Sequence, residues 1–374
     1  MNKQLIKYLV ISDIHLGHNI NKTEYIVNNL RDYIFRNKKF KDLDIIFIAG
    51  DIFDRLLNPS SNDMILACVW LTELVKFCKE RKIKLRILEG TPSHDWKQAK
   101  LISNIIEKLN IEIDYKYIDT LFIEDMEDLG LSILYIPDEY KHKASDTFKD
   151  VKKLMKSLGK VMVDIAIMHG QFNYQLPIKL ESSHDEEDYR SIVRFYINIG
   201  HIHTHSVRQH IIAQGSFDRL VHGEEEDKGA VLVTLEKIFD KIGFKYEFIP
   251  NHKAMIFKTV DYKDHDIEYI LKDLSTICKK LPIPSNLRIL TKQHSELSKN
   301  LPTIKTLYPG INIKIENKEK QKVEKLNLLE NKVVDESFNI TKENIRELMD
   351  NEMKVHGYSK EQLAIYEEIM KEVV

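Results

Sequence analysis

Residues 42–51 read DLDIIFIAGD, an apolar run of strand length that stops at an aspartate. Three other segments are similar apolar runs that stop at a carboxylate or a histidine, namely KYLVISD at 7–13, IKLRILEG at 83–90 and VDIAIMHG at 163–170. Continuous apolar runs, as opposed to alternating ones, are typical of strands buried on both faces. Helical patterns separate the first three segments, and strand–helix–strand units predict parallel pairing with right-handed crossovers. The sequence therefore predicts an α/β fold.

The other elements extend this pattern over one large domain. Residues 62–82 predict a long helix, because Trp70 and Leu74 recur at helical spacing, and a shorter helix is expected at 22–36. Further strands are predicted at 131–137, 194–201 and 229–236. Residues 1–250 are within the usual size range of a single domain.

The composition shifts near Pro250, and residues 251–316 predict a small α/β capping domain. Its strands are expected at 257–262, 286–290 and 312–316, with a helix at 267–281.

The last part of the chain has a different character. Residues 317–340 are highly charged and predict a linker or a solvated helix, and residues 341–374 predict a C-terminal helix–loop–helix. The apolar faces of these two helices either dock a partner or pack on each other or on the main domain.

The length, composition and net charge of the chain exclude several classes of protein. The chain has 374 residues, is 43% hydrophobic and carries a formal net charge of −2, so it has no overall basic field. Any nucleic-acid partner must therefore be held by a local patch or by metal ions. The three cysteines are scattered and form no CxxC pair, which favours a reducing compartment. No apolar run approaches the roughly 20 residues that span a bilayer, so we expect a cytosolic protein without a membrane partner.

Chemically capable side chains stand where strands end. They are Asp13, His15, Asp51, His169, His201 and His203. The carboxyl ends of strands in open α/β sheets form the functional edge, and residues two apart in an extended segment share a face. A single aspartate at a strand end is more often a helix cap, and a single histidine is more often a structural residue. Together, in this order, they predict a site for a pair of divalent metal ions.

Five motifs, DIHLG, GDIFD, SHD, HG and GHIH, occur in this order. They resemble the calcineurin-like metallophosphoesterase superfamily. The segments GDIFDRLLNPS at 50–60 and GSFDRLVHGEEEDKGAVLV at 215–233 make the chain more similar to the SbcD-type nuclease subunit of DNA double-strand-break repair and its phage counterparts. The resemblance implies a four-layer sandwich of mixed sheets flanked by helices, with a small capping domain and C-terminal helices.

The resemblance also implies a ligand set. It assigns the first metal to Asp13, His15, Asp51 and His203, and the second to Asp51, His169 and His201. Asp51 would be the bridging carboxylate.

The loop GTPSHDW at 90–96 departs from the family pattern. Ser93 stands where the family usually has an asparagine that binds the second metal, so either the serine oxygen or a water held by it would be the ligand. The second metal is then expected to bind less tightly than the first. His94 matches the histidine that faces the scissile phosphate. Asp95 either orients His94 or caps a helix that starts near Trp96.

The resemblance implies a manganese-dependent DNA exonuclease or endonuclease with two metal ions. Its expected partner is an SbcC-type, SMC-like ATPase, with the chain as a homodimer within a heterotetramer, in the cytoplasm of a bacterial or phage-infected cell. The expected process is DNA repair or recombination. A generic metallophosphoesterase acting on nucleotides or phosphoproteins is an alternative, but it leaves the C-terminal third unexplained. A non-catalytic scaffold is a second alternative, but it fits poorly with so many filled ligand positions.

Overall fold

A computed structural model describes residues 3–238, 241–262 and 265–317 of the chain. The predicted C-terminal helix–loop–helix at 341–374 lies outside the described residues, as does the charged segment apart from Asn317. Two large sheets lie in one compact unit, and a three-stranded sheet is formed by later strands of the chain.

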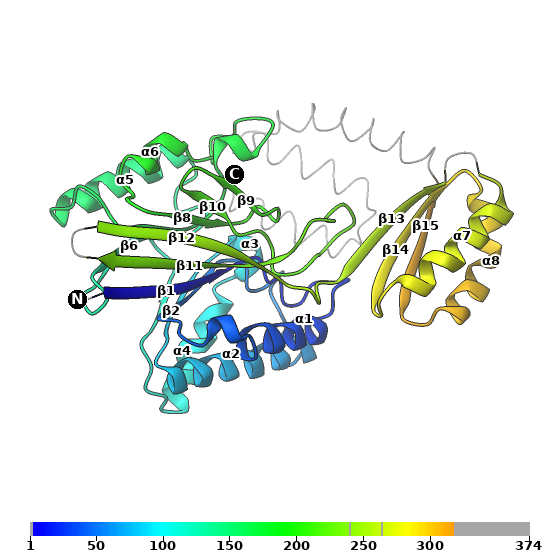
Figure 1. Cartoon of the computed structure of the whole chain (residues 1–374), viewed down its shortest axis with the longest axis horizontal. Coiled ribbons are helices and arrows are strands. Elements are labelled where there is room, and N and C mark those ends of the chain that lie inside the picture. Colours follow the sequence, from blue (N-terminus) through cyan, green and yellow to red (C-terminus); the bar gives the residue numbers. More distant parts are fainter. Residues whose placement is uncertain (1–2, 239–240, 263–264, 318–374) are drawn as a thin grey trace, which may run out of the picture. The chain divides into compact units, whose positions relative to one another are not determined.

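The first large sheet has the strand order β12-β11-β1-β2-β3-β4 (Figure 1). Its strands are β1 (Lys3–Ile11), β2 (Ile45–Ala49), β3 (Lys84–Leu88), β4 (Tyr115–Ile118), β11 (Gly229–Ile238) and β12 (Lys241–Pro250). The run from β1 to β4 is parallel, whereas β11 pairs antiparallel with β1 and β12 antiparallel with β11. The predicted parallel units are therefore present, but the hairpin of β11 and β12 makes the sheet mixed.

The second large sheet has the order β5-β6-β7-β8-β10-β9. Its strands are β5 (Phe122–Met126), β6 (Leu131–Ile136), β7 (Ile165–His169), β8 (Ile197–Gly200), β9 (Ser206–Arg208) and β10 (Ile211–Ala213). Strands β6, β7, β8 and β10 are parallel, and β5 and β9 are antiparallel edges. The parallel pairing predicted from the apolar runs is thus divided between two sheets, and both sheets are mixed, as the resemblance implies.

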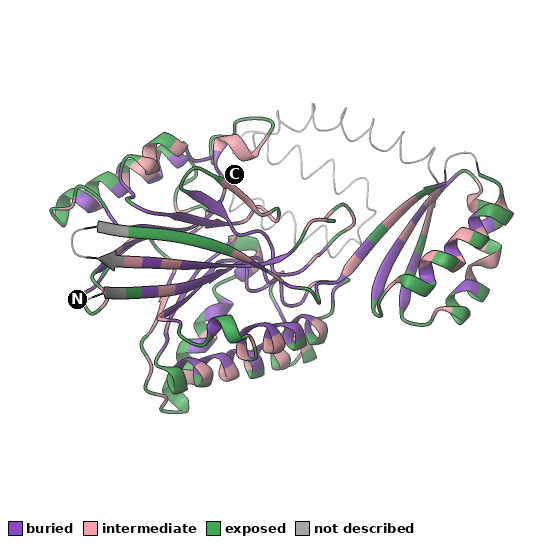
Figure 2. Ribbon diagram, in the orientation of Figure 1, coloured by how far each residue is buried: buried purple, intermediate pink, exposed green. Residues whose placement is uncertain are grey.

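Side chains on each strand alternate between two apolar layers. Tyr8 and Val10 of β1 point into a core shared by the two sheets, whereas Leu9 and Ile11 point into a core between the first sheet and its helices. A third core lies between the second sheet and its own helices. Figure 2 shows the resulting buried strands enclosed by helices with exposed outer faces. The four-layer α/β sandwich predicted from the sequence is therefore confirmed.

Helices cover the outer face of each sheet (Figure 1). The first sheet packs against α1 (Thr23–Leu30), a π-helical turn (Arg31–Phe35), α2 (Asn62–Arg81) and α4 (Leu101–Lys108). The second packs against α5 (Ala144–Ser157) and α6 (Glu186–Arg190). Shorter turns are α3 (Pro92–Asp95) and the 3₁₀ segments Lys38–Phe40, Gln98–Lys100 and Asn173–Gln175.

Helix α2 shows how local sequence sets these bounds. The Ser61 hydroxyl accepts a hydrogen bond from the Met64 amide at 3.2 Å, which caps the first turn. Lys82 adopts a left-handed conformation with φ of 57°, which ends the helix.

The third sheet consists of β13 (Ile256–Tyr262), β14 (Ser285–Thr291) and β15 (Ile311–Asn317). Helix α7 (Ile267–Lys280) follows β13, and α8 (His294–Leu307) connects β14 to β15. The predicted strands and the first helix are present here, whereas α8, with Pro302 inside it, was not expected. The predicted domain limits at 250 and 316 stay predictions.

None of the helices in the described part of the chain combines the length and the apolar character needed to cross a membrane.

Candidate metal centre

The predicted ligands come together where strands of the two large sheets end. Three groups have ligand atoms within 4.8 Å of one another. They are Asp13 with His15 and His203, His15 with Asp51 and His94, and Asp51 with His169 and His201. Because the second group shares His15 with the first and Asp51 with the third, the three groups form one continuous site.

Backbone pairing holds the segments that follow β1 and β2 side by side. The amides of Ile14 and Leu16 donate to the carbonyls of Asp51 and Ile52, each at 2.8 Å. Asp13, His15 and Asp51 have φ values of 52°, 55° and 52°, a left-handed conformation that residues other than glycine rarely adopt. Such residues cost about 1–3 kcal/mol each and cluster at functional sites. The fold therefore spends stability to place these three side chains.

Close packing fixes the ring of His169 against two glycines. A Cβ added to Gly50 would lie 2.1 Å from His169 Nδ1, and one added to Gly200 would lie 2.8 Å from it. His169 Nδ1 donates to the Ala49 carbonyl at 2.6 Å. This bond holds the ring so that Nε2 is directed at Asp51 Oδ1, 3.3 Å away, where a bound metal ion would take the place of the proton on Nε2.

The first metal position lies among Asp13, His15 and His203. The Nε2 atoms of the two imidazoles are 3.2 Å apart, and His203 Nε2 lies 4.0 Å from Asp13 Oδ1. Asp13 is fully buried, and its carboxylate accepts the amide of His201 at 3.0 Å. Three ligand atoms thus face one small space.

A carboxylate stands behind each histidine of this position, near His15 at ion-pair distance and hydrogen-bonded to His203. His15 Nδ1 lies 3.2 Å from Asp54 Oδ1, and His203 Nδ1 lies 2.8 Å from Glu224 Oε1. Burial raises the pKa of Glu224, but the bonds from His203 and the Leu220 amide outweigh it and bring the pKa to about 2. An ionised carboxylate behind an imidazole fixes its tautomer and makes it a stronger metal ligand.

Asp51 faces both metal positions. Its Oδ2 lies 3.8 Å from His15 Nε2, whereas its Oδ1 lies 3.3 Å from His169 Nε2. Burial alone would raise the pKa of Asp51, but the charge and hydrogen bond of His169, with His94 and His15, hold it well below its usual range. A buried, ionised carboxylate directed at two imidazole clusters has the geometry of a bridging ligand.

The second position gathers Asp51, His169, His201 and a residue that was not expected, Thr91. Thr91 Oγ1 lies 3.4 Å from His169 Nε2 and 3.3 Å from His201 Nδ1. Ser93, which the sequence suggested as the ligand here, is instead exposed, and its carbonyl accepts the Trp96 indole N–H at 2.8 Å. The structure therefore brings Thr91, two residues earlier, into this cluster.

His94 stands at the rim of the site. Its Nδ1 lies 2.8 Å from Asp51 Oδ2, and its side chain is 36% exposed, slightly more than those of His201 and His203 at 31% and 30%. The hydrogen bond to Asp51 raises the pKa of His94, which favours the protonated ring. This position is compatible with an imidazole that contacts a substrate phosphate.

Asp95 has a different environment from that expected of a residue orienting His94. It is fully buried and accepts backbone N–H bonds from Asp51 at 3.0 Å, Gly90 at 2.8 Å and Phe53 at 2.9 Å. Burial and the charges of Asp51 and Glu89 hold the pKa of Asp95 above its usual range. Asp95 thus joins the loop after β2 to the loop after β3, and Asp51 is the partner of His94.

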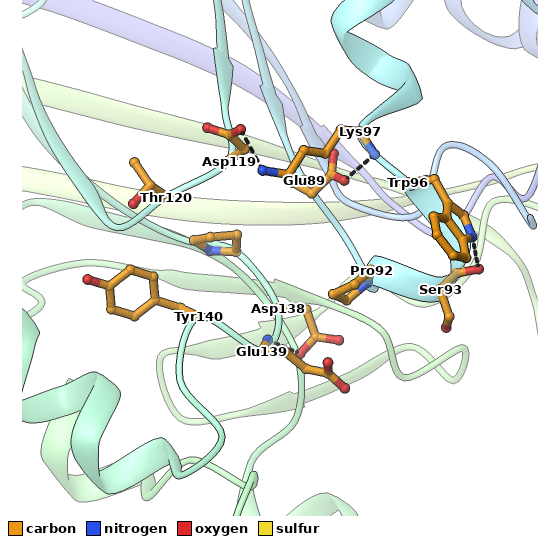
Figure 3. Close-up of a pocket in the computed structure, with 11 residues that line it drawn as sticks. Glu89, Pro92, Ser93, Trp96, Lys97, Asp119, Thr120, Asp138, Glu139 and Tyr140 are labelled. Carbon is orange, nitrogen blue, oxygen red and sulfur yellow. Dashed lines mark hydrogen bonds and ion pairs between the residues drawn. The ribbon is translucent and has the colours of Figure 1, made fainter. Parts of the chain in front are cut away.

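A cavity of about 780 Å³ adjoins the second position. Figure 3 shows Asp138 and Glu139 on one side of it and Glu89 and Lys97 on the other, with the Trp96 indole near Ser93. The cavity leads from the predicted catalytic loop to the segment after β6, so a substrate could extend in this direction.

The residues fit divalent metal ions. Carboxylate oxygens and imidazole nitrogens suit manganese, iron or zinc, and the outer contacts of His15, His169 and His203 leave a nitrogen directed inward in each case. The buried His and Asp groups can therefore hold a metal ion.

Sequence reasoning missed four residues around the site, namely Thr91, Asp138, Glu224 and Lys228. Asp54 stands where some members of the resembling family carry a second catalytic histidine, and its contact with His15 was not expected. Glu224 and Lys228 lie in the segment 215–233 that carried part of the family resemblance, but no ligand pattern singled them out. Lys228 is buried and donates to the His203 carbonyl at 2.9 Å. Asp138 directly follows the predicted strand 131–137, so the strand-end pattern could have found it, whereas Thr91 has neither a carboxylate nor an imidazole to single it out.

No family model matches this chain. One solved crystal structure is 11% identical, with an alignment that covers 66% of this chain and all of the other, at a TM-score of 0.36. The crystal structure of TT1561 of Thermus thermophilus is 12% identical, with 65% of this chain and 99% of that chain covered and a TM-score of 0.34. Likeness at this level carries no argument, so the site is interpreted from its own residues.

Proposed function

We propose that this chain is a two-metal phosphodiesterase that cleaves DNA and works with an SbcC-type ATPase in repair or recombination. One observation carries the proposal. His15 links the first metal-capable group to the second, Asp51 links the second to the third, and His94, a member of the second group, stands at the rim. Two adjacent metal positions with a half-exposed imidazole are suited to in-line displacement at phosphorus.

The residues divide the chemistry between them. Two bound divalent ions, for which we propose manganese, would neutralise the phosphate and lower the pKa of an attacking water. Asp51 would hold both positions at a fixed separation through its two oxygens. His94, with its raised pKa, would stabilise charge on the phosphate or protonate the leaving oxygen.

The test compares digestion of linear duplex DNA with hydrolysis of a small chromogenic phosphodiester, each with and without manganese. We expect manganese-dependent cleavage of both substrates, with DNA preferred. Hydrolysis of the small diester without DNA digestion would favour a generic metallophosphoesterase. Absence of both activities in a metal-loaded protein would favour a scaffold role.

The proposed ATPase partner would dock on the predicted C-terminal helices. Truncation after Glu336 removes them, so the shortened chain should still fold and bind metal but fail to co-purify with the ATPase. Undiminished co-purification would contradict this part of the proposal.

A further inference from the structure

The hydroxyl of Thr91 occupies a crowded polar position at the second metal site. Thr91 Oγ1 lies 3.3 Å from Asp51 Oδ2, 3.2 Å from Asp138 Oδ2, 3.4 Å from His169 Nε2 and 3.3 Å from His201 Nδ1. A hydroxyl has one proton and two lone pairs, so it cannot satisfy four polar neighbours at once. Such a convergence of donor atoms is typical of a metal-binding cage.

The backbone places this hydroxyl firmly. The Thr91 amide donates to Asp51 Oδ1 at 2.6 Å, directly after Gly90 at the end of the β3 segment. Pro92 restricts Thr91 to an extended conformation, and its φ and ψ are −62° and 126°. The side chain is thereby held toward Asp51.

Asp138 approaches the same position from the second sheet. It follows β6 after Pro137, and its Oδ1 accepts the amide of Glu139 at 2.9 Å. Its Oδ2 lies 3.2 Å from Thr91 Oγ1 and 3.7 Å from His201 Nδ1, and its side chain is only 14% exposed. One oxygen is therefore fixed by the backbone, whereas the other points into the site.

We propose that Thr91 Oγ1 and Asp138 Oδ2 complete the second metal position together with Asp51, His169 and His201. This inference rests on the metal site of the proposed function. Five protein donors would leave one position of an octahedral ion for water or phosphate.

With these ligands, the second position would have a different ligand type and a different metal affinity from those expected with Ser93. The resembling family supplies a neutral amide here, whereas this chain would supply a carboxylate and a hydroxyl. A second carboxylate beside Asp51 adds negative charge, and oxygen donors favour manganese or magnesium over softer metals. The second metal should then bind at least as tightly as the first, contrary to the expectation drawn from Ser93.

The test measures manganese binding by the full-length chain without substrate, by calorimetry and electron paramagnetic resonance. The wild-type chain should bind two ions, with the spin coupling of a close pair. Asp138→Asn should weaken only the second site, by at least about 10–100-fold, the range seen when outer partners are lost. Thr91→Val should weaken it less, and Thr91→Ser should restore it.

Glu139→Gln is the matched control, because Glu139 is the exposed neighbour of Asp138. Equal second-site affinity in Asp138→Asn, Thr91→Val and this control would overturn the inference while leaving the proposed function in place. A wild-type chain that binds no manganese would overturn both.

A thiolate at position 138 provides a readout that is independent of stability and of activity. Thiolates prefer soft metals and give a charge-transfer absorption when they bind Co²⁺ or Cd²⁺. Asp138→Cys should therefore show a thiolate-to-metal band that Glu139→Cys and the wild-type chain lack. The absence of this band in a folded, cobalt-loaded Asp138→Cys protein would show that residue 138 is not a ligand.

Discussion

The two metal positions of this molecule are built in different ways. At the first, Asp13, His15 and His203 face one another, and Asp54 and Glu224 stand behind the two histidines. At the second, Thr91 and Asp138, which follow β3 and β6 of the two large sheets, lie beside Asp51 and His201. The first position thus has carboxylates behind its imidazoles, whereas the second has an additional carboxylate and a hydroxyl directed into it.

The two positions should therefore respond to different substitutions. Loss of a carboxylate behind His15 or His203 should affect the first ion, whereas loss of Thr91 Oγ1 or Asp138 Oδ2 should affect the second.

The largest effect is expected for Asp51→Asn, because Asp51 faces both positions. The amide replaces one ligand oxygen with an N–H donor and removes the shared charge, so both manganese ions should be lost on dialysis. Metal content would be measured beside Asp13→Asn, which should lose the first ion and keep more of the second. Equal retention of two ions in the Asp51 variant would rule out the bridging role.

Only some residues of the metal site could be predicted from the sequence. Strand-end ligands were found because a buried apolar run, such as residues 45–49, fixes where the next polar residue must lie. Asp138 directly follows the predicted strand 131–137 and could have been found by the same rule, whereas Thr91 has neither a carboxylate nor an imidazole to single it out. Ser93 was expected as the ligand because it stands where the resembling family has an asparagine, but it is exposed.

The fold, too, could be predicted only in part from the sequence. The strands and the four layers were predicted from apolar periodicity and the family resemblance, but the apolar runs by themselves favour one parallel sheet. Strand β12 was missed because it is an edge strand with an exposed face, where Phe244 and Tyr246 are 37% and 40% exposed and polar residues interrupt the run. Pairing direction and division into two sheets depend on the path of the chain, and apolar runs do not record it.

The second largest effect is expected for a substitution of His94, and it should be on the rate of DNA cleavage and not on metal binding. His94→Gln should lower DNA cleavage by about 10²–10⁴-fold, the usual cost of losing a general acid or base, with manganese affinity nearly unchanged at both positions. The steady-state rate at saturating manganese would be compared with that of His142→Gln, an exposed histidine outside the site. Cleavage at the parent rate would show that His94 does not act on the substrate.

A smaller effect, confined to the first position, is expected for Glu224→Gln. The neutral amide cannot polarise His203 as the carboxylate does, so affinity for the first ion should fall by about 10–100-fold. The second ion should be unaffected. Glu225→Gln, the exposed neighbour, is the control, and calorimetric titration with manganese is the measurement. Equal weakening of both ions would mean that the two positions are not separable as described.

The smallest effect is expected where the sequence first suggested the largest weakness, at Ser93. If Ser93 supplied the second-metal ligand, Ser93→Asn would lower the manganese concentration for half-maximal cleavage and Ser93→Ala would raise it. Because Ser93 is exposed and Thr91 Oγ1 lies among Asp51, His169 and His201, both variants should instead give the wild-type curve. Thr91→Val, measured in the same titration, should move the midpoint to higher manganese. Opposite shifts for the Ser93 variants, with Thr91→Val unchanged, would return the ligand to Ser93 and require the loop to rearrange when metal binds.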